Sequence, residues 1–188
     1  MYGERQWHIL LYLNHKEYRM IREVEGDILL SKAQVIAHGI APQEHFDIGL
    51  ALALRERWPS MVRDYRHAMH ARVMQPGEMW AWAGVDEQGN PVRIVNLITQ
   101  TMMGQGPAAK PGKATLENVS HSLKALADFV QEEGISSVAL PRLATGVGGL
   151  EWADIKPLIE KRFADLPVTV VVYETYHKDV QANEGLAA

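Results

Sequence analysis

The sequence contains no cysteine among its 188 residues. This absence excludes disulfide bonds, thiolate catalysis, cysteine-bound zinc and iron–sulfur clusters, and it fits a reducing compartment. The sequence also lacks an apolar run long enough to cross a membrane, and residues 1–18 have no signal-peptide cleavage pattern. We therefore expect a cytoplasmic protein that has no membrane partner.

Neither sign of charge is in large excess. The chain has 19 lysine and arginine residues against 23 aspartate and glutamate residues, which gives a net charge of −4. This balance argues against a surface that binds nucleic-acid backbones over its whole extent. A local basic surface stays open, because Arg55, Arg57, Arg63 and Arg66 fall on two adjoining expected helices, although a solvated helical face is the simpler explanation.

The length and composition are those of one ordinary globular domain. A chain of 188 residues, 47% of them hydrophobic, can bury a single compact core without covalent help. We predict one domain over residues 1–180. Because residues 181–188 are small and polar, we expect them to form a disordered tail.

Short apolar runs alternate with amphipathic stretches along the chain. This alternation predicts an α/β protein with three layers, α/β/α, and a mixed central sheet. The expected strands are 8–13, a run within 18–30, 35–41, 79–85, 92–99, 136–143 and 168–173, and the expected helices lie near 50–58, 59–69, 116–130 and 155–159. Residues 101–114 are rich in Gly, Pro and Met without periodicity, so we expect an irregular functional loop there.

A glycine-rich loop, Thr145-Gly146-Val147-Gly148-Gly149-Leu150, follows the expected strand 136–143. Glycine lets the backbone approach a ligand closely and point successive N–H groups at one anion, and the helix that follows adds its dipole. The arrangement favours a phosphate or diphosphate, although a tight turn that needs positive φ explains the glycines equally well. Lys110 and Lys113, in the expected irregular loop, carry charges that could also meet a phosphate.

A second group of polar side chains, Gln43, Glu44, His45 and Asp47, precedes Gly49, where a helix is expected to begin. Such groups could position a water molecule or transfer a proton near a bound sugar. In the alternative interpretation, Asp47 caps the helix and the other side chains are solvated.

Isolated polar residues have both structural and functional interpretations. Asp27 lies between two apolar runs, where it could accept a hydrogen bond from the amino group of a base or serve as an ordinary turn residue. His38 lies inside an expected strand, as a core histidine would. His67 and His70 are three residues apart on an expected helix, but no third ligand has compatible spacing, so we predict no metal and no other cofactor.

Several segments, taken together, resemble a macrodomain, and the subfamily that contains the terminal ADP-ribose protein glycohydrolases and their bacterial antitoxin relatives is the most similar. The resemblance spans Val24–Tyr176 in the same linear order, and its most specific part runs from Pro141-Arg142 to Trp152. The segments are EGDIL at 25–29, VIAHGI at 35–40, IVNLIT at 94–99, KP at 110–111 with ATLEN at 114–118, and LPRLATGVGGLEW at 140–152.

The resemblance implies a pocket for ADP-ribose, or a related nucleotide, over the carboxyl edge of the sheet. In such a pocket Asp27 would bind the adenine amino group, with Ile28 supplying backbone beside it and Tyr176 against the adenine. The glycine-rich loop would enclose the diphosphate, and His45, Asp47 and Gly49 would border the distal ribose. The expected ligand contacts are Asp27, Ile28, His38, Gly39, Gly49, Gln100, Thr145, Gly146, Val147, Gly148, Gly149, Leu150 and Tyr176. An ADP-ribosylated protein or nucleic acid would be the macromolecular partner.

Two departures from the subfamily bear on catalysis. In its hydrolytic members a lysine directly follows the LIT motif and attacks the anomeric carbon, and an acidic residue occupies one position of the glycine-rich loop. This chain has Gln100 and Gly148 at those positions. A carboxamide cannot form the covalent adduct that a lysine can, so that route is closed at position 100.

These departures leave alternatives open. The domain either reads ADP-ribose without cleaving it or hydrolyses the linkage through a water molecule, with Asp47, His45 or Glu44 as the base. As an enzyme it would remove an ADP-ribosyl group, or an acyl or phosphate group, from the distal ribose. A domain that binds RNA or nucleic-acid ends is a third alternative, which the net charge disfavours.

Overall fold

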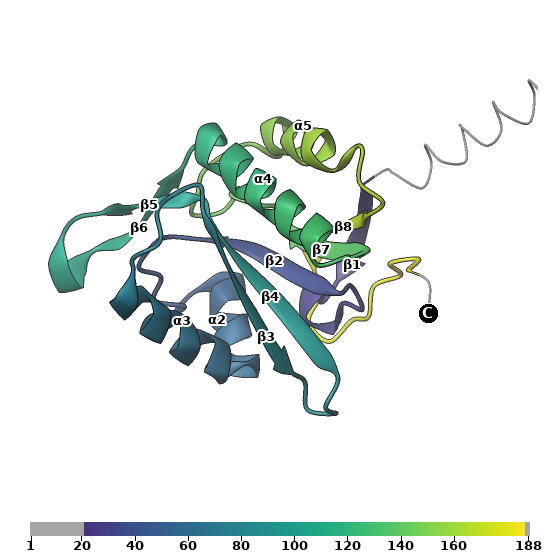
Figure 1. The fold of residues 1–188 in the computed structure, drawn as a ribbon, viewed down its shortest axis with the longest axis horizontal. Coiled ribbons are helices and arrows are strands. Elements are labelled where there is room, and N and C mark those ends of the chain that lie inside the picture. The colour runs from purple at the N-terminus through teal and green to yellow at the C-terminus, as the bar shows by residue number, and fades with distance from the viewer. Residues whose placement is uncertain (1–20, 187–188) are drawn as a thin grey trace, which may run out of the picture.

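The computed structural model describes residues 21–186, so the expected strand 8–13 and the first residues of the run 18–30 lie outside the described part. A six-stranded sheet in the order β1-β8-β7-β2-β4-β3 forms the centre (Figure 1). Its strands are β1 (Arg22–Gly26), β2 (Val35–Ile40), β3 (Met79–Val85), β4 (Pro91–Ile98), β7 (Ser137–Pro141) and β8 (Thr169–Tyr176). Every neighbouring pair is parallel except β3 with β4, so the predicted mixed sheet is confirmed.

Helices cover both faces of the sheet (Figure 1). α4 (Leu116–Glu132) and α5 (Trp152–Phe163) pack on one face, whereas α2 (Gly49–Arg57) and α3 (Pro59–Ala71) pack on the other. Two short 3-10 helices, η1 (Ile28–Leu30) and η2 (Gly106–Ala108), lie in the connections between other elements. The arrangement confirms the three-layer α/β/α fold predicted from the alternating pattern.

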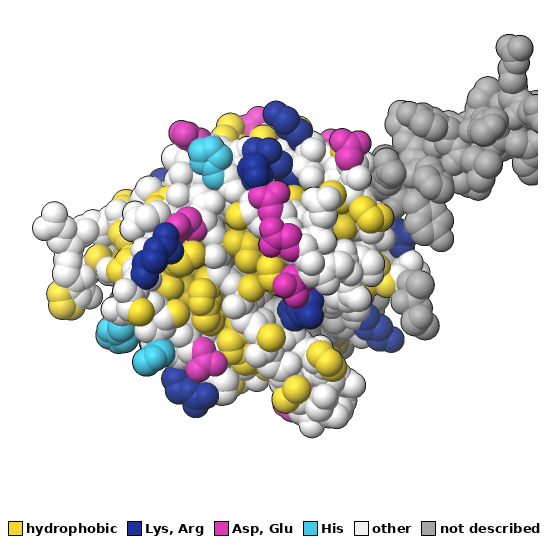
Figure 2. Space-filling view, viewed as in Figure 1, with side chains coloured by type: hydrophobic (Ala, Val, Ile, Leu, Met, Phe, Trp, Pro, Cys, Tyr) yellow, Lys and Arg dark blue, Asp and Glu magenta, His cyan; other side chains and the backbone are white. Residues whose placement is uncertain are grey.

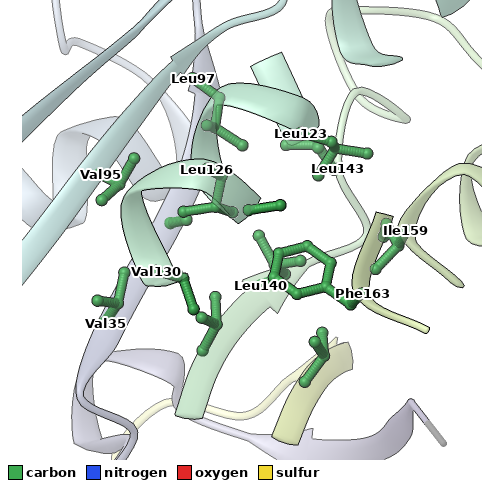
Figure 3. Close-up of a cluster of buried hydrophobic side chains, with 14 of the residues drawn as sticks. Val35, Val95, Leu97, Leu123, Leu126, Val130, Leu140, Leu143, Ile159 and Phe163 are labelled. Atoms are coloured by element: carbon green, nitrogen blue, oxygen red, sulfur yellow. The ribbon is translucent and has the colours of Figure 1, made fainter. Parts of the chain in front are cut away.

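The amphipathic pattern of α4 explains how its layer is held. Thr115 caps the helix by accepting a hydrogen bond from a main-chain N–H of the first turn. Leu123, Leu126 and Val130 recur on one face, are fully buried, and meet Leu140 of β7 in one hydrophobic cluster (Figure 3). Burying such side chains stabilises the fold by about 1.5–3 kcal/mol each.

Residues 101–114 form a hairpin, so the prediction of an irregular loop is wrong. β5 (Gln100–Met103) pairs antiparallel with β6 (Lys110–Ala114), and the two strands project from one end of the main sheet (Figure 1). Gly104 and Gly106 adopt φ values of 81° and 66° at the tip, a conformation that side chains disfavour. The glycines therefore mark the turn of a two-stranded ribbon.

The C-terminal segment 181–186 packs against the core, in contrast to the disorder predicted from its composition. The buried carboxylate of Glu184 accepts hydrogen bonds from the Ser31 hydroxyl, from the Lys32 N–H at 2.9 Å and from the Tyr173 phenol at 2.7 Å. A single acidic side chain thus joins the segment to η1 and β8. The remaining residues of the predicted tail, 187–188, lie outside the described part.

Side chains of both charges surround hydrophobic ones on the face that carries α4 and β3 (Figure 2), in keeping with the small net charge. Within residues 21–186, no helix combines the length and the apolar character needed to cross a membrane.

Candidate functional site

A cavity of about 440 Å³, which we call the first cavity, opens at the carboxyl ends of β1, β7 and β8 beside the start of α2. It joins residues that are far apart in the sequence: Gly26, Ile28, Gly49, Leu50, Leu52, Ala53, Glu56, Pro141, Tyr173 and Tyr176. Three of the residues expected at a ligand, Ile28, Gly49 and Tyr176, are therefore neighbours around one space.

Asp27 lies between two residues that line the first cavity, and its carboxylate is almost fully buried. One carboxylate oxygen accepts a hydrogen bond of 3.0 Å from the Leu29 N–H, and the other accepts one of 2.9 Å from the Asp179 N–H. Asp27 therefore caps η1 and ties β1 to the segment after β8. Because a carboxylate oxygen can accept more than one hydrogen bond, this turn role leaves capacity for a ligand donor.

The Tyr176 side chain is 55% exposed and forms a wall of the first cavity. Partial desolvation and the negative charges of Asp27 and Asp179 raise the pKa of its phenol, which is neutral at pH 7. A neutral, half-exposed aromatic ring is the kind of surface on which a nucleobase stacks.

The N-terminus of α2 faces the first cavity through Gly49 and Leu50. The residue before the helix is Ile48 and no side chain caps it, so Asp47 does not take the capping role considered from the sequence. Gly49 has a φ of 57°, and a Cβ built on it would meet no atom within 4 Å. Uncapped N–H groups and the helix dipole make such an end attractive to an anion.

The glycine-rich loop after β7 is held largely by its own backbone. The N–H of Gly149 donates to the Gly146 carbonyl, and the N–H of Leu150 donates to the Ala144 carbonyl, both at 3.0 Å. A Cβ on Gly148 would lie 2.6 Å from the Ala144 oxygen, and Gly149 has a φ of 74°. The tight-turn interpretation therefore accounts for these two glycines.

Gly146 differs from the other two loop glycines, because a Cβ built on it would meet no atom within 4 Å. The neighbouring Val147 is 44% exposed. This side of the loop faces open space, although no loop residue lines the first cavity. The contact of residues 145–150 with a diphosphate stays a prediction.

Two residues of the motif that contains the loop anchor it. Arg142 forms an ion pair of 2.7 Å with Glu174, and its guanidinium lies 5.9 Å from the centre of the Trp152 ring. The Trp152 indole donates to Glu23 at 3.3 Å, and the Thr145 hydroxyl donates to the Arg142 carbonyl at 2.7 Å. Both ends of the loop are thus attached to β1 and β8.

Lys113 lies beside the glycine-rich loop in the structure. The sequence does not predict this contact, because the two segments are far apart in the chain. The Nζ of Lys113 is 2.8 Å from where a Cβ on Gly149 would be, so the lysine side chain lies directly against the loop backbone. Among the described residues it has no ion-pair partner. The β5–β6 hairpin brings this exposed ammonium to the loop, because Lys113 stands near the end of β6.

The three polar residues Glu44, His45 and Asp47 of the loop after β2 have different environments. Glu44 is buried and accepts hydrogen bonds from the N–H groups of residues 41 and 46, so it shapes the loop. His45 and Asp47 are exposed. The His45 ring contacts the Ala109 carbonyl at 3.2 Å, and among the described residues it forms no hydrogen bond with Asp47.

Three of the expected ligand residues, His38, Gly39 and Gln100, pack against other parts of the protein and do not line the first cavity. The His38 ring lies 2.7 Å from the Asn96 side-chain oxygen, and burial lowers the pKa of His38 to about 4, so the ring is neutral at pH 7. A Cβ on Gly39 would lie 2.7 Å from the Thr99 hydroxyl. The Gln100 amide donates to a carbonyl of β6 at 2.8 Å.

A second cavity, of about 370 Å³, lies at the other end of the same sheet edge. It is lined by the loop after β2, the α3–β3 connection and the β5–β6 hairpin, and its residues are Pro42, Gln43, Val73, Gln75, Pro76, Thr101, Met102, Gly104, Gln105, Gly106 and Ala109. In the sequence, His45 lies between Gln43, which lines the second cavity, and Gly49, which lines the first. The His45 ring contacts Ala109 of the second cavity.

No group of three or more His, Asp or Glu side chains in the described part of the chain is arranged to hold a metal ion. His67 and His70, the pair considered from the sequence, both lie on α3.

The layers and the sheet order define a three-layer α/β/α domain with cavities where its parallel strands end. The chain belongs to the macro domain family, whose family model matches residues 43–159. The family predicted from the sequence is therefore confirmed.

Two curated relatives illustrate the range of similar proteins. The DNA ADP-ribosyl glycohydrolase of Mycobacterium tuberculosis is 28% identical over 155 residues, which cover 82% of this chain and 42% of the relative. The human ADP-ribose glycohydrolase OARD1 is 30% identical over 154 residues, which cover 81% of this chain and 90% of the relative. This chain spans less than half the length of the DNA ADP-ribosyl glycohydrolases that it matches.

Solved structures agree with the family. The macrodomain of Mycobacterium tuberculosis DarG has a TM-score of 0.70 and 26% identity, and the match covers 82% of this chain and 97% of that one. The macrodomain of Thermus aquaticus DarG has a TM-score of 0.69 and 27% identity, with 82% and 98% of the two chains covered.

Proposed function

We propose that this protein binds ADP-ribose, with the adenine in the first cavity and the distal ribose beyond the N-terminus of α2. The observation that carries the proposal is the meeting of Ile28, Gly49 and Tyr176 around one space. Tyr176 offers a face for a base, and Gly49 opens the uncapped helix end toward a diphosphate. Asp27, directly before Ile28, retains acceptor capacity for a base amino group.

We further propose that the ADP-ribose is carried by a nucleic acid. Several relatives are named for ADP-ribosyl groups on DNA, and their similarity extends over four-fifths or more of this chain. An ADP-ribosylated protein is the alternative partner.

The ligand experiment compares ADP-ribose, ADP and AMP by titration calorimetry. We expect ADP-ribose to bind more tightly than AMP by about tenfold or more, because the diphosphate gains contacts at the helix end. Equal affinity for the three nucleotides would overturn the assignment of a distal-ribose site and leave a general adenylate pocket.

A cavity-filling variant tests the location. Ala53 lines the first cavity from α2, so Ala53→Phe should fill that space and abolish ADP-ribose binding. Ala164→Phe, at an exposed position after α5, is the control and should bind normally. Normal binding by a folded Ala53→Phe variant would place the ligand elsewhere.

Hydrolysis is the second candidate function, favoured by two exposed proton-transfer groups, His45 and Asp47, on the loop that borders both cavities. Either group would take a proton from a water whose oxygen bonds to the anomeric carbon of the distal ribose. The bond to the acceptor breaks, and the acceptor leaves with a proton. Gln100 is not a nucleophile in this route.

The hydrolytic route is tested with His45→Gln and Asp47→Asn, each assayed for release of ADP-ribose from a modified oligonucleotide. We expect one of the two to lower kcat at least about a hundredfold while ADP-ribose still binds. Unchanged release in the double variant would overturn this route, and no release by the unsubstituted protein would make the domain a reader.

A further inference from the structure

The two cavities lie in sequence along one edge of the sheet. The first is lined from the ends of β1, β8 and β7, which are the first three strands in sheet order, whereas the second is lined by segments that follow β2 and β4 or precede β3. The loop 42–49 contributes Pro42 and Gln43 to the second cavity and Gly49 to the first. A ligand that extends from the first cavity past this loop therefore reaches the second.

The lining of the second cavity is uncharged and rich in carboxamides. Gln43, Gln75 and Gln105 come from three different segments, and among the described residues the side chains of Gln43 and Gln105 form no hydrogen bond. A carboxamide carries a donor and an acceptor side by side, which is the pattern that reads the edge of a nucleobase. The apolar surfaces of Pro76 and Met102 line the same space and can pack against a flat ring.

Charged groups stand near this cavity instead of in its lining. Lys110 directly follows the lining residue Ala109, and Arg66 donates to the carbonyl of His45, whose ring contacts Ala109. Neither cation has an ion-pair partner among the described residues. An uncharged interior does not suit a phosphate, but cations outside it suit the backbone phosphates on either side of a bound base.

We propose that the second cavity holds the nucleobase to which the ADP-ribose is attached. The inference rests on the proposed function, because ADP-ribose in the first cavity is what directs its acceptor into the second. The carboxamides favour a base over the ester-linked side chain of a protein, because a base edge offers both donors and acceptors to Gln43 and Gln105, whereas an ester offers acceptors only.

The test compares three probes by fluorescence anisotropy: free ADP-ribose, a short single-stranded oligonucleotide that carries ADP-ribose on one base, and a peptide that carries it on a glutamate. Where a probe is cleaved, its KM replaces the dissociation constant. We expect the oligonucleotide to bind about tenfold more tightly than ADP-ribose, and the peptide to gain nothing. The double variant Gln43→Ala/Gln105→Ala should lose most of this gain but keep its affinity for free ADP-ribose.

Gln131→Ala, at an exposed position of α4 away from the cavity, is the matched control and should bind all probes normally. Equal affinity of the oligonucleotide and ADP-ribose, an equal gain with the peptide, or a full gain in the double variant would each overturn the inference. Failure of ADP-ribose itself to bind would instead overturn the proposed function, and this inference with it.

Discussion

The side-chain amide of Gln100 donates a hydrogen bond of 2.8 Å to the main-chain carbonyl of Gly112. Gln100 begins β5 and Gly112 lies in β6, so the bond closes the base of the hairpin that forms one wall of the second cavity. Both residues are buried. The carboxamide of Gln100 thus has a structural partner.

Gln100→Ala should loosen this hairpin, because the buried Gly112 carbonyl loses its partner at a cost of about 1–3 kcal/mol. We expect faster amide hydrogen exchange in β5 and β6, with little change in the affinity for free ADP-ribose. Mass spectrometry measures the hydrogen exchange, and titration calorimetry on the same sample measures the affinity for ADP-ribose. Lost affinity with an unchanged exchange pattern would show that Gln100 contacts the ligand directly.

The glycine-rich loop allows a matched comparison of two glycines. Gly148→Ala should lower the melting temperature and weaken ADP-ribose binding, because the new Cβ would lie 2.6 Å from the Ala144 oxygen and force the loop to move. Gly146→Ala should leave the melting temperature unchanged, since the new Cβ meets no protein atom within 4 Å.

The ligand affinity of the Gly146→Ala variant then reports on the open side of the loop. Weaker binding with unchanged stability is expected, because a diphosphate close to the backbone would meet the added methyl group. Unchanged affinity would contradict contact between this loop and the ligand. Thermal denaturation and calorimetry separate the two effects.

How far the sequence predicts the fold depends on whether the signal is local. The periodicity of Leu123, Leu126 and Val130 predicts α4, and the apolar run 168–173 predicts β8, because each pattern reflects one buried face or one fully buried strand. The β5–β6 hairpin has no such signal. Its four- and five-residue strands are rich in Gly, Pro and Met and do not alternate.

The candidate site is predicted only in part for the same reason. Ile28 belongs to a segment that resembles the family, and Gly49 and Tyr176 lie within the span of the resemblance. The sheet brings these three residues to one edge. The position of Lys113 beside Gly149 depends on the hairpin, and the partners of Glu184 lie about 150 residues earlier in the chain as well as in β8. Neither composition nor local periodicity predicts contacts between segments that are so far apart in the sequence.

Lys113→Met should weaken the binding of ADP-ribose and ADP by about three- to tenfold, because the ammonium beside Gly149 is available to a diphosphate. Adenosine, which lacks phosphates, should bind equally to both proteins. Added salt should reduce the difference, since screening weakens an exposed charge contact. Calorimetry at two salt concentrations measures both effects.

Lys110→Met provides the control, because Lys110 is exposed on the same strand but lies at its other end. Equal losses of ADP-ribose affinity in the two variants would point to a general charge effect and contradict a specific contact by Lys113.

Glu184→Ala should lower the free energy of unfolding by about 2–4 kcal/mol, because the Ser31 hydroxyl, the Lys32 N–H and the Tyr173 phenol lose a common buried acceptor. Since Tyr173 also lines the first cavity, ADP-ribose affinity should fall too. Urea denaturation measures the loss. Glu160→Ala, at an exposed position of α5, should change stability little, and an equal effect of the two would contradict a structural role for residues 181–186.

The buried histidine of β2 should make folding depend on pH. The pKa of His38 falls from 6.5 to about 4, chiefly because burial disfavours its charged form. Between these values the unfolded chain binds a proton that the folded protein does not. The resulting stability is fully present above pH 6.5 and is lost as the pH falls toward 4, with a limit of roughly 3 kcal/mol.

His38→Gln keeps a neutral group that can bond to Asn96 but removes the titration. The free energy of unfolding, measured with urea from pH 4 to 7.5, should therefore fall less steeply with acid in this variant than in the unsubstituted protein. The difference between the two curves isolates His38, because every other titrating group is shared. Parallel curves over this range would mean that the folded protein accepts the proton as readily as the unfolded chain, and a buried neutral His38 could not then be maintained.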